Sequence, residues 1–343
     1  MVREARYFEA VGDGRVRCTL CPRDCRLREG QAGFCFVREN RGGRLVTTAW
    51  GRSTGFAVDP IEKKPLAHYL PGSTVLSFGT AGCNLGCRFC QNWDISKARL
   101  GDGRARDGWT PERVVELARQ EGSPGIAFTY NDPVIWAEYA IDVARAAHAE
   151  GLFTAFVTAG YVCAGAREEI FAHMDAANVD LKGFTEDFYS RLTLAHLAPV
   201  LETLEWLARW GRTWVEVTNL LIPGANDSPA ETRDLSRWLV EHMGPDVPLH
   251  LTAFHPDFRM RDVPPTPPAT LTRAREIALR EGLRYVYTGN VHDPTGQTTF
   301  CPSCGTAVVE RDWHAVRRLR MRGASCAACG ARIAGRFAEG GRA

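Results

Sequence analysis

The sequence predicts an α/β fold, in which a parallel sheet has helices outside it and a cysteine-rich segment lies at each end of the chain. From about Val75 to Gly289, short apolar β-branched segments alternate with longer segments of helical character. This order is typical of parallel strands joined by helices. All but Cys163 of the 12 cysteines fall into three clusters along the chain. A length of 343 residues allows one large domain with small appendages.

Each predicted strand is a short apolar run that ends at glycine or at polar residues. The predicted strands are Thr74–Gly79, Gly125–Tyr130, Phe153–Thr158, Asn178–Lys182, Trp214–Ile222, Leu249–Phe254 and Tyr285–Thr288. The predicted helices between them include Pro111–Gln120, Pro133–Glu150, Pro199–Trp210, Ser228–Met243 and Ala269–Glu281. An N-cap residue followed by proline marks two helix starts, at Thr110 and Ser228. We therefore predict a cysteine-rich extension over residues 1–73, the strand–helix domain over 74–296 and a further module over 297–343.

The composition is that of an ordinary globular protein, with 45% hydrophobic residues and a net charge of +2. No apolar run approaches the roughly 20 residues that a membrane span needs. The first residues carry no apolar core of a secretory signal. We therefore expect a cytoplasmic protein without membrane contact, whose cysteines bind metals in a reducing compartment and do not form disulfides.

The most informative motif is a loop after the first predicted strand that contains Cys83, Cys87 and Cys90. Four thiolates normally hold a [4Fe–4S] cluster, so three leave one iron open to a further ligand. The alternative is a structural zinc knuckle or buried thiols. Zinc prefers paired Cys-x2-Cys knuckles with four ligands, and the fourth is missing from this loop.

The spacing Cys-x3-Cys-x2-Cys, with an aromatic residue before the last cysteine, resembles the radical S-adenosylmethionine (SAM) superfamily. The resemblance implies that the open iron takes the amino and carboxylate groups of SAM. One electron then splits SAM into methionine and a 5′-deoxyadenosyl radical. It also implies a partial (β/α)6 barrel with its chemistry at the carboxyl ends of the strands. Taken without the resemblance, the residues also fit a doubly wound open sheet.

A polar turn, Tyr130-Asn131-Asp132-Pro133, ends the second predicted strand. In radical SAM proteins this position holds a turn that binds the amino group of SAM, so the resemblance makes Asn131 and Asp132 candidate SAM ligands. Many relatives carry Glu where this chain has Asp132. The alternative for Asp132 is a plain helix N-cap before proline.

Asp180 and Lys182 lie two residues apart, which would place both side chains on one face of a strand. The Asp-Leu-Lys sequence resembles one that lies at SAM in activating enzymes of glycyl-radical enzymes. The alternative is a salt bridge within the barrel. Asn219 and His255 follow later strands and are weaker candidates for binding the cofactor.

Cysteines at both ends of the chain predict further metal sites. Cys18, Cys21, Cys25 and Cys35 suit either zinc or an auxiliary iron–sulfur cluster. Cys301, Cys304, Cys326 and Cys329 form two Cys-x2-Cys-Gly knuckles, which predict a structural zinc ribbon. Arginines and Trp313 between the knuckles could hold RNA or an acidic partner, or could form a solvated hairpin face.

The chain as a whole resembles the AmmeMemoRadiSam-system radical SAM enzymes, which stand beside pyruvate formate-lyase activating enzymes. The resemblance rests on the cysteine patterns, on Asp59-Pro60-Ile61-Glu62-Lys63-Lys64-Pro65 and on Thr129-Tyr130-Asn131-Asp132-Pro133. It implies a radical SAM oxidoreductase that receives electrons from a flavodoxin or ferredoxin type of donor and takes hydrogen from a substrate such as a protein glycine. The alternative is C–H modification of an RNA or small molecule together with Memo-like and AMMECR-like partners. A third possibility is a non-catalytic metal-binding adaptor.

Overall fold

The computed structural model describes residues 2–99, 103 and 105–338, and the chain forms two compact units. The first unit comprises residues 1–59, 75–175 and 190–203. The second comprises residues 60–74, 176–189 and 204–343. Met1 and residues 339–343 of the predicted C-terminal module lie outside the described residues.

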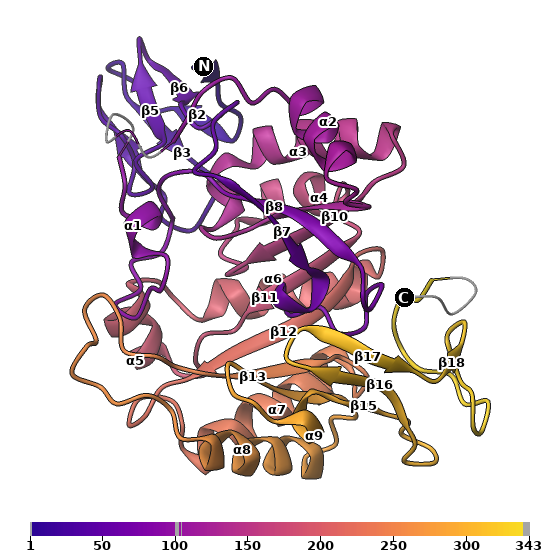
Figure 1. The fold of residues 1–343 in the computed structure, drawn as a ribbon. Coiled ribbons are helices and arrows are strands. Elements are labelled where there is room, and N and C mark those ends of the chain that lie inside the picture. Colours follow the sequence, from indigo (N-terminus) through magenta and orange to yellow (C-terminus); the bar gives the residue numbers. More distant parts are fainter. Residues whose placement is uncertain (1, 100–102, 104, 339–343) are drawn as a thin grey trace. The chain divides into compact units, whose positions relative to one another are not determined.

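The first unit contains the parallel strands β8 (Thr74–Phe78), β9 (Gly125–Phe128) and β10 (Phe153–Thr158) (Figure 1). The helices α2 (Pro111–Gln120) and α3 (Ala137–Ala149) pack against each other. Both also pack against β9, and α3 packs against β10. The chain continues from β10 into α4 (Ala164–Phe171). Strands β8 and β9 are mainly apolar and buried along nearly their whole length, as expected for a parallel sheet with covered faces.

Aromatic side chains fill the core of the first unit. Phe128 packs edge-to-face on Phe78, Trp136 and Phe156, with ring centroids 5.7, 5.7 and 6.3 Å away. All four rings are buried. Such edge-to-face pairs add to the burial energy of the rings, and they fix the positions at which β8, β9 and β10 deliver their following loops.

The N-terminal residues of the first unit form two small antiparallel sheets. Their strands are β1 (Arg3–Glu4), β5 (Arg38–Arg41) and β6 (Arg44–Thr47) in one sheet, and β2 (Phe8–Ala10), β3 (Val16–Cys18) and β4 (Arg26–Leu27) in the other. Strand β7 (Phe56–Pro60) follows them. A buried ion pair joins this region to α3, with 2.8 Å between Arg38 Nη1 and Glu138 Oε2.

The second unit contains the parallel strands β11 (Ala176–Asp180), β12 (Trp214–Leu221), β13 (Leu249–Ala253) and β14 (Val286–Gly289). Helices α7 (Pro229–Met243) and α8 (Pro268–Arg280) pack side by side, and α8 contacts β13 and β14 (Figure 1). The remaining short helices of the chain are η1 (Ile61–Lys63), α1 (Trp93–Ser96), η2 (Pro133–Trp136), α5 (Glu186–Phe188), the π-helix η3 (Tyr189–Thr193) and α9 (Pro294–Gln297). Helix α6 spans Ala198–Trp210.

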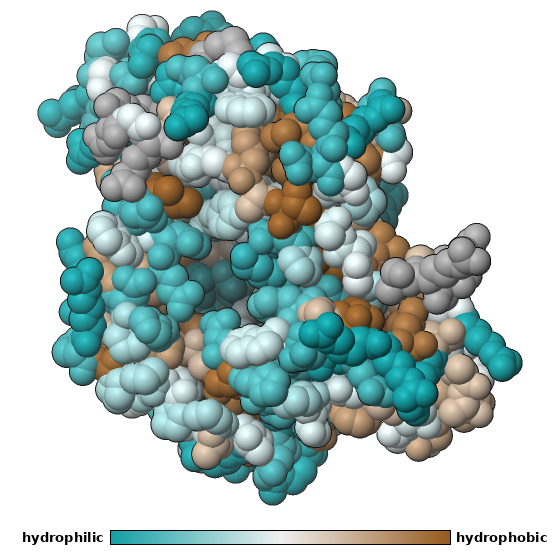
Figure 2. All heavy atoms as spheres, viewed as in Figure 1, coloured by the Kyte–Doolittle hydropathy of each residue, from teal (hydrophilic) through white to brown (hydrophobic). Residues whose placement is uncertain are grey.

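The C-terminal module is built from short antiparallel strands. They are β15 (Thr299–Phe300), β16 (Ala307–Asp312), β17 (Ala315–Leu319), β18 (Met321–Arg322) and β19 (Ser325–Cys326). Buried Val308, Val309 and Ile333 of the module cluster with Tyr285 and Tyr287 at the start of β14. On the face shown in Figure 2, the surface over β17 is strongly hydrophilic.

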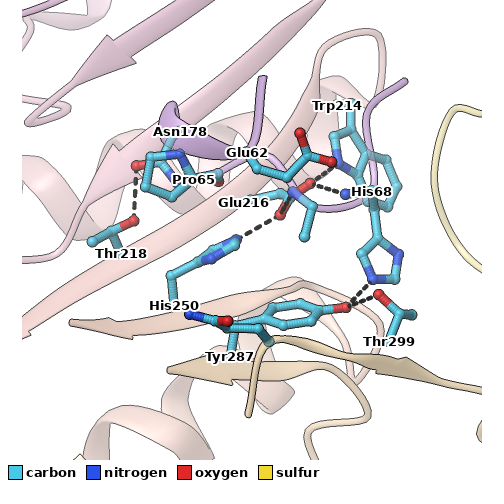
Figure 3. Close-up of polar contacts among 12 residues, drawn as sticks. Glu62, Pro65, His68, Asn178, Trp214, Glu216, Thr218, His250, Tyr287 and Thr299 are labelled. Carbon is cyan, nitrogen blue, oxygen red and sulfur yellow. Dashed lines mark hydrogen bonds and ion pairs between the residues drawn. The ribbon is translucent and has the colours of Figure 1, made fainter. Parts of the chain in front are cut away.

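A buried polar network holds residues 60–74 against the amino ends of β12, β13 and β14 (Figure 3). The Glu216 carboxylate on β12 is fully buried and accepts four hydrogen bonds. Their donors are Ala67 N (2.8 Å), His68 N (2.7 Å), Trp214 Nε1 (2.9 Å) and His250 Nε2 (2.6 Å). Burial opposes ionisation, but the His250 hydrogen bond and nearby histidines hold the pKa of Glu216 below its usual range.

The same network reaches the C-terminal module. His68 lies 2.5 Å from the Ala334 carbonyl through Nδ1 and 2.5 Å from the Tyr287 hydroxyl through Nε2. The carbonyl can only accept, so Nδ1 carries the hydrogen. Arg311 on β16 donates to the Ala67 carbonyl (2.6 Å) and pairs with buried Glu62 (3.5 Å). This network is polar and built from long-range partners, and it lies at the strand ends opposite those that precede Asp180 and Asn219.

The predicted elements are largely confirmed. Helix α2 has the predicted bounds, and Thr110 and Ser228 accept from Arg113 N and Glu231 N as the predicted N-caps. The predicted helix over 133–150 begins as the 3-10 turn η2, since Asp132 caps Pro133–Trp136 before α3 starts. The predicted strand over 178–182 is wrong at its end, because β11 stops at Asp180. Closure of the strands into a partial (β/α)6 barrel stays a prediction, as do the predicted domain boundaries. No described helix has the length and apolar character needed to cross a membrane.

Candidate functional site

The loop with Cys83, Cys87 and Cys90 follows the carboxyl end of β8, as predicted. It runs from Gly79 to α1, and its backbone is held by the last residues of η3: Gly86 N donates to Thr193 O and Arg88 N to Leu192 O, both at 2.8 Å. Gly79 is required because a Cβ there would lie 2.5 Å from the Thr129 carbonyl. The loop is therefore packed tightly against the following strand end.

The thiols of the loop stand among polar groups that suit metal ligands. The backbone N–H of Leu85 donates to Cys83 Sγ (3.4 Å), and that of Asp132 is a second donor. Burial, and then the Asp132 carboxylate, raises the pKa of Cys83 to about 11. Cys90 Sγ lies 3.6 Å from Ser96 Oγ. Backbone N–H bonds such as those to Cys83 tune iron–sulfur clusters, so the three thiols of the loop fit a cluster of this kind.

Asn131 is the clamp that holds this loop to the end of β9. Its Nδ2 donates to Gly82 O (2.8 Å) and to Thr80 Oγ1 (3.2 Å), while its Oδ1 accepts from Thr80 N (3.2 Å) and Trp136 Nε1 (3.3 Å). The side chain is buried. These four bonds use the hydrogen-bonding capacity of the amide. The sequence suggested a ligand here and gave no sign of the clamp, because Thr80 and Gly82 are about 50 residues away along the chain.

Asp132 joins the ends of β9 and β10. Its Oδ1 accepts from Val134 N (3.1 Å) and Thr158 Oγ1 (2.9 Å), and its Oδ2 accepts from Ala159 N (3.1 Å). The N-cap alternative is thus confirmed by the bond to Val134. Asp132 also lies close enough to Cys83 for its charge to act on that thiol, so it belongs to the same site as the loop.

Tyr130 is a member of the site that the sequence did not single out by itself. Its backbone adopts φ 71°, which is rare for a residue with a side chain. Its carbonyl accepts from Asn92 Nδ2 (2.9 Å) and its hydroxyl lies 3.1 Å from Asp59 Oδ2. Asn92 closes the cysteine loop, so this turn ties both ends of the loop to β9. Backbone strain of this kind is kept only where surrounding contacts hold it.

In the second unit, Asp180, Lys182 and Asn219 meet at the carboxyl ends of β11 and β12. Lys182 Nζ lies 2.9 Å from Asp180 Oδ2, with both side chains partly exposed. Strand β11 ends at Asp180, so Lys182 lies just beyond it, and the two side chains meet as their two-residue spacing predicted. Buried Asn219 Nδ2 donates to the carbonyl of Leu181 between them (2.7 Å).

His255 follows β13 and its side chain is exposed. The structure therefore places it at the carboxyl end of a strand, as predicted. Cys163 is half-buried at the N-terminus of α4, where its N–H donates to the Leu20 carbonyl (3.0 Å).

The four C-terminal cysteines come together as predicted. The sulfur atoms of Cys301 and Cys329 are 3.6 Å apart, and those of Cys304 and Cys326 are 3.8 Å apart. All four lie within 4.8 Å of one another. A tetrahedral ion with metal–sulfur bonds of about 2.3 Å sets its sulfurs about 3.8 Å apart. The knuckles are thus shaped for a single metal ion.

The N-terminal cysteines also meet. Cys18, Cys21, Cys25 and Cys35 line one enclosed cavity beneath the Cys83 loop, and Asn84 of that loop lines it too. Burial raises the pKa of Cys35 to about 11, and burial raises that of Cys21 well above its usual range. Buried thiols in one cavity fit a metal site, since a metal would stabilise the thiolates.

The comparisons with known proteins agree with this geometry. Residues 78–235 match the model of the Radical SAM superfamily. The uncharacterized protein MJ0808 of Methanocaldococcus jannaschii is 42% identical over 90% of this chain and 92% of its own length. The pyruvate formate-lyase-activating enzyme of Clostridium pasteurianum is 24% identical over 53% of this chain and 80% of its own.

Among solved structures, a radical SAM methyltransferase from Sphaerobacter thermophilus shares the fold, with a TM-score of 0.51 and 19% identity. The similarity covers 65% of this chain and 68% of that protein. The predicted cysteine loop lies inside the matched region. The chain therefore belongs to the Radical SAM superfamily, in one family with MJ0808 of M. jannaschii.

Proposed function

We propose that the protein is a radical SAM oxidoreductase that holds a [4Fe–4S] cluster on Cys83, Cys87 and Cys90. The observation that carries the proposal is the position of these thiols at the carboxyl end of β8, clamped by Asn131 and next to Asp132. When bound, the cluster supplies the electron that cleaves SAM and leaves a 5′-deoxyadenosyl radical to take hydrogen from a substrate.

The chain's own residues have separable tasks in this proposal. Asn131 positions the loop, because all of its hydrogen bonds go to the loop and to Trp136. Asp132 places negative charge beside Cys83 and could accept from the ammonium of SAM. Asp180 and Lys182 present opposite charges at a strand end, which suits the charged groups of SAM, and Asn219 keeps their turn in shape. His255 offers an exposed imidazole to the cofactor or substrate.

For the substrate we propose a protein glycine, by likeness to the pyruvate formate-lyase-activating enzyme. The electron donor would then be a flavodoxin or ferredoxin type of protein. We place the protein in the cytoplasm, because its 12 cysteines and the proposed cluster call for a reducing compartment. The C-terminal module would hold a structural zinc ion, in line with its sulfur spacing.

A second candidate is modification of an RNA within an AmmeMemoRadiSam-type system, with Memo-like and AMMECR-like partners. It is favoured by the exposed face of β17. Trp313 is 47% exposed and stacks on His292, while Arg318 and Arg322 are exposed. Stacking aromatic residues beside arginines are typical of RNA-binding surfaces. Binding of a tRNA pool that is lost in Trp313→Ala would support it, and a glycyl-radical enzyme encoded next to the gene would favour the first candidate.

The proposed activity is tested by anaerobic reconstitution with iron and sulfide, followed by dithionite and SAM. We expect 5′-deoxyadenosine from the wild-type protein and none from Cys87→Ala. Cys163→Ala is the matched control, because Cys163 lies outside all three clusters and should leave the product unchanged. Equal product from Cys87→Ala and the wild type would overturn the assignment of the loop.

A further inference from the structure

The cavity lined by Cys18, Cys21, Cys25 and Cys35 contains more than thiols. Its lining also includes two arginines, Arg23 and Arg38. Two nitrogen atoms of these arginines, Arg23 Nη2 and Arg38 Nε, are buried and have no hydrogen-bond partner among the described residues. Buried donors are rarely left without an acceptor. An anionic group within the cavity would supply both.

Backbone N–H groups donate to three of the four thiols. The backbone N–H of Arg23 donates to Cys21, that of Phe34 to Cys25, and those of Val37 and Arg38 to Cys35. Hydrogen bonds of this kind favour the thiolate. In iron–sulfur proteins they also set the reduction potential. Glu138 accepts hydrogen bonds only from Nη1 of Arg38, so Nε of Arg38 remains available to a group in the cavity.

The spacing of the sulfurs separates this site from a single-ion site. In the C-terminal module all four sulfurs lie within 4.8 Å of one another. Within residues 2–99, no three of the cysteines meet that criterion, neither in the N-terminal set nor in the Cys83 loop. One ion with bonds of about 2.3 Å cannot reach thiols that stand farther apart, whereas a cluster of several metal atoms fills the space between them. The N-terminal set thus resembles the Cys83 loop and differs from the ribbon.

The N-terminal site touches both neighbours of Cys83. Asn84 lines the cavity, and its carbonyl accepts from Arg23 Nε at 2.7 Å. Gly82 packs against the Cys35 backbone so closely that a Cβ at position 82 would lie 2.0 Å from the Cys35 carbonyl oxygen. Cys83, a ligand of the loop, is therefore flanked along the chain by two residues that contact the N-terminal site.

We propose that Cys18, Cys21, Cys25 and Cys35 hold a second iron–sulfur cluster and that electrons reach the Cys83 loop through it. The relay rests on the proposed function; the second cluster does not. A reduced low-potential donor protein gives one electron to the N-terminal site, which returns to its oxidised state when the electron passes on. No bond forms or breaks and no proton moves in this step.

Iron content and spectra of the full chain test the cluster. The protein is reconstituted with iron and sulfide, and electron paramagnetic resonance is recorded after reduction by dithionite. We expect Cys83→Ala/Cys87→Ala/Cys90→Ala to keep about four irons and a reduced-cluster signal that SAM does not change. We expect Cys18→Ala/Cys21→Ala/Cys25→Ala/Cys35→Ala to lose that signal and to keep one that SAM shifts. The proposal would be overturned if the variant that lacks the three loop cysteines contained no iron and held zinc in its N-terminal site.

If the N-terminal variant does not fold, the wild-type protein provides the test instead. It should hold about eight irons, and its two reduced clusters should broaden each other's signals because their ligands are neighbours. Two independent, unbroadened signals would overturn the relay. If the wild-type protein showed only the signal that SAM does not change, the proposed function would be refuted but the second cluster would still be supported. Cys304→Ser is the matched control and should change zinc content without changing iron.

The rate of electron entry tests the relay directly. A reduced ferredoxin is mixed with oxidised protein, and reduction of the SAM-sensitive cluster is followed by rapid freezing. We expect the N-terminal variant to be reduced at least about tenfold more slowly than the wild type, while excess dithionite still reduces it fully. Equal rates with ferredoxin would show that electrons bypass the N-terminal site.

Discussion

Replacing Glu216 by glutamine should loosen the second unit at one defined place. The two residues have the same shape, so the change is one of hydrogen bonding. One carboxylate oxygen accepts from Ala67 N and His250 Nε2, and the other accepts from His68 N and Trp214 Nε1. A glutamine keeps one oxygen and presents an NH2 group to the other two donors. The NH2 group cannot replace the bonds from Ala67 N, His68 N or Trp214 Nε1, but it can donate to His250 Nε2, so one or two hydrogen bonds are lost depending on how the amide turns.

The magnitude follows from the number and kind of bonds. A hydrogen bond to a charged group contributes ~1.5–3 kcal/mol, so the loss of one or two bonds should lower the free energy of unfolding of the second unit by ~1.5–6 kcal/mol. Hydrogen exchange on peptides covering residues 60–74 reads the loss at Ala67 and His68. A change of ~3 kcal/mol corresponds to exchange that is faster by more than about a hundredfold.

The control is Glu310→Gln in the C-terminal module. Glu310 pairs with Arg320 at 3.6 Å, and both side chains are more than a third exposed. Such a surface pair contributes ~0–1 kcal/mol, so its loss should leave exchange over residues 60–74 unchanged. The reasoning would be refuted if Glu216→Gln lowered the unfolding free energy by less than about 1 kcal/mol, within the range of the surface control.

Asp180→Ala and Lys182→Ala should each weaken SAM binding about tenfold, which is ~1.4 kcal/mol, while the cluster spectrum without SAM stays unchanged; titrations that match the wild type in both variants would return the pair to a structural role. Cys304→Ser should remove zinc and raise hydrogen exchange after residue 297 without lowering SAM cleavage, and retained zinc would refute the ribbon assignment. Burial lowers the pKa of His68 to about 4. The stability that neutral His68 contributes is therefore complete above its pKa in the unfolded chain, near 6.5, and is lost as the pH falls toward 4. His68→Gln should therefore flatten the loss of stability over that range. The pKa of His148 is raised by its hydrogen bond to a carboxylate, so protonated His148 stabilises the folded protein below about pH 6.5 and this stabilisation is lost as the pH rises. His148→Gln should therefore remove a loss of stability that occurs on raising the pH.

The regular elements could be predicted from the sequence because their signals are local. The bounds of α2 follow from Thr110, Pro111 and the apolar spacing after them, and β10 follows from its β-branched and aromatic run. The Cys83 loop and the ribbon knuckles were predicted for the same reason, since each pattern lies within a few residues. The two-residue spacing of Asp180 and Lys182 predicted that their side chains meet, although the strand itself ends at Asp180.

The networks could not be predicted, because their partners are far apart along the chain. Glu216 meets the backbone of His68 across 148 residues, and His68 meets Tyr287 across 219. One signal was present: Glu216 stands between Val215 and Val217 in a predicted strand, and a buried carboxylate requires donors. The identity of those donors is not written in any local pattern. The same holds for Asn131, whose amide holds Thr80 and Gly82 across about 50 residues.

The His68 contacts also bear on the order in which the protein is made. Residues 60–74 leave the ribosome early, yet His68 binds the carbonyl of Ala334, 266 residues later, and Glu62 pairs with Arg311, 249 residues later. Until those residues have been synthesised, the Glu62–Arg311 ion pair and the His68–Ala334 hydrogen bond cannot form, and Tyr285 and Tyr287 lack the module residues that pack on them. Contacts of such long range form slowly and leave surfaces open to aggregation meanwhile. The second unit is therefore expected to complete its folding only after most of the chain has been translated, and to depend on chaperones during that interval.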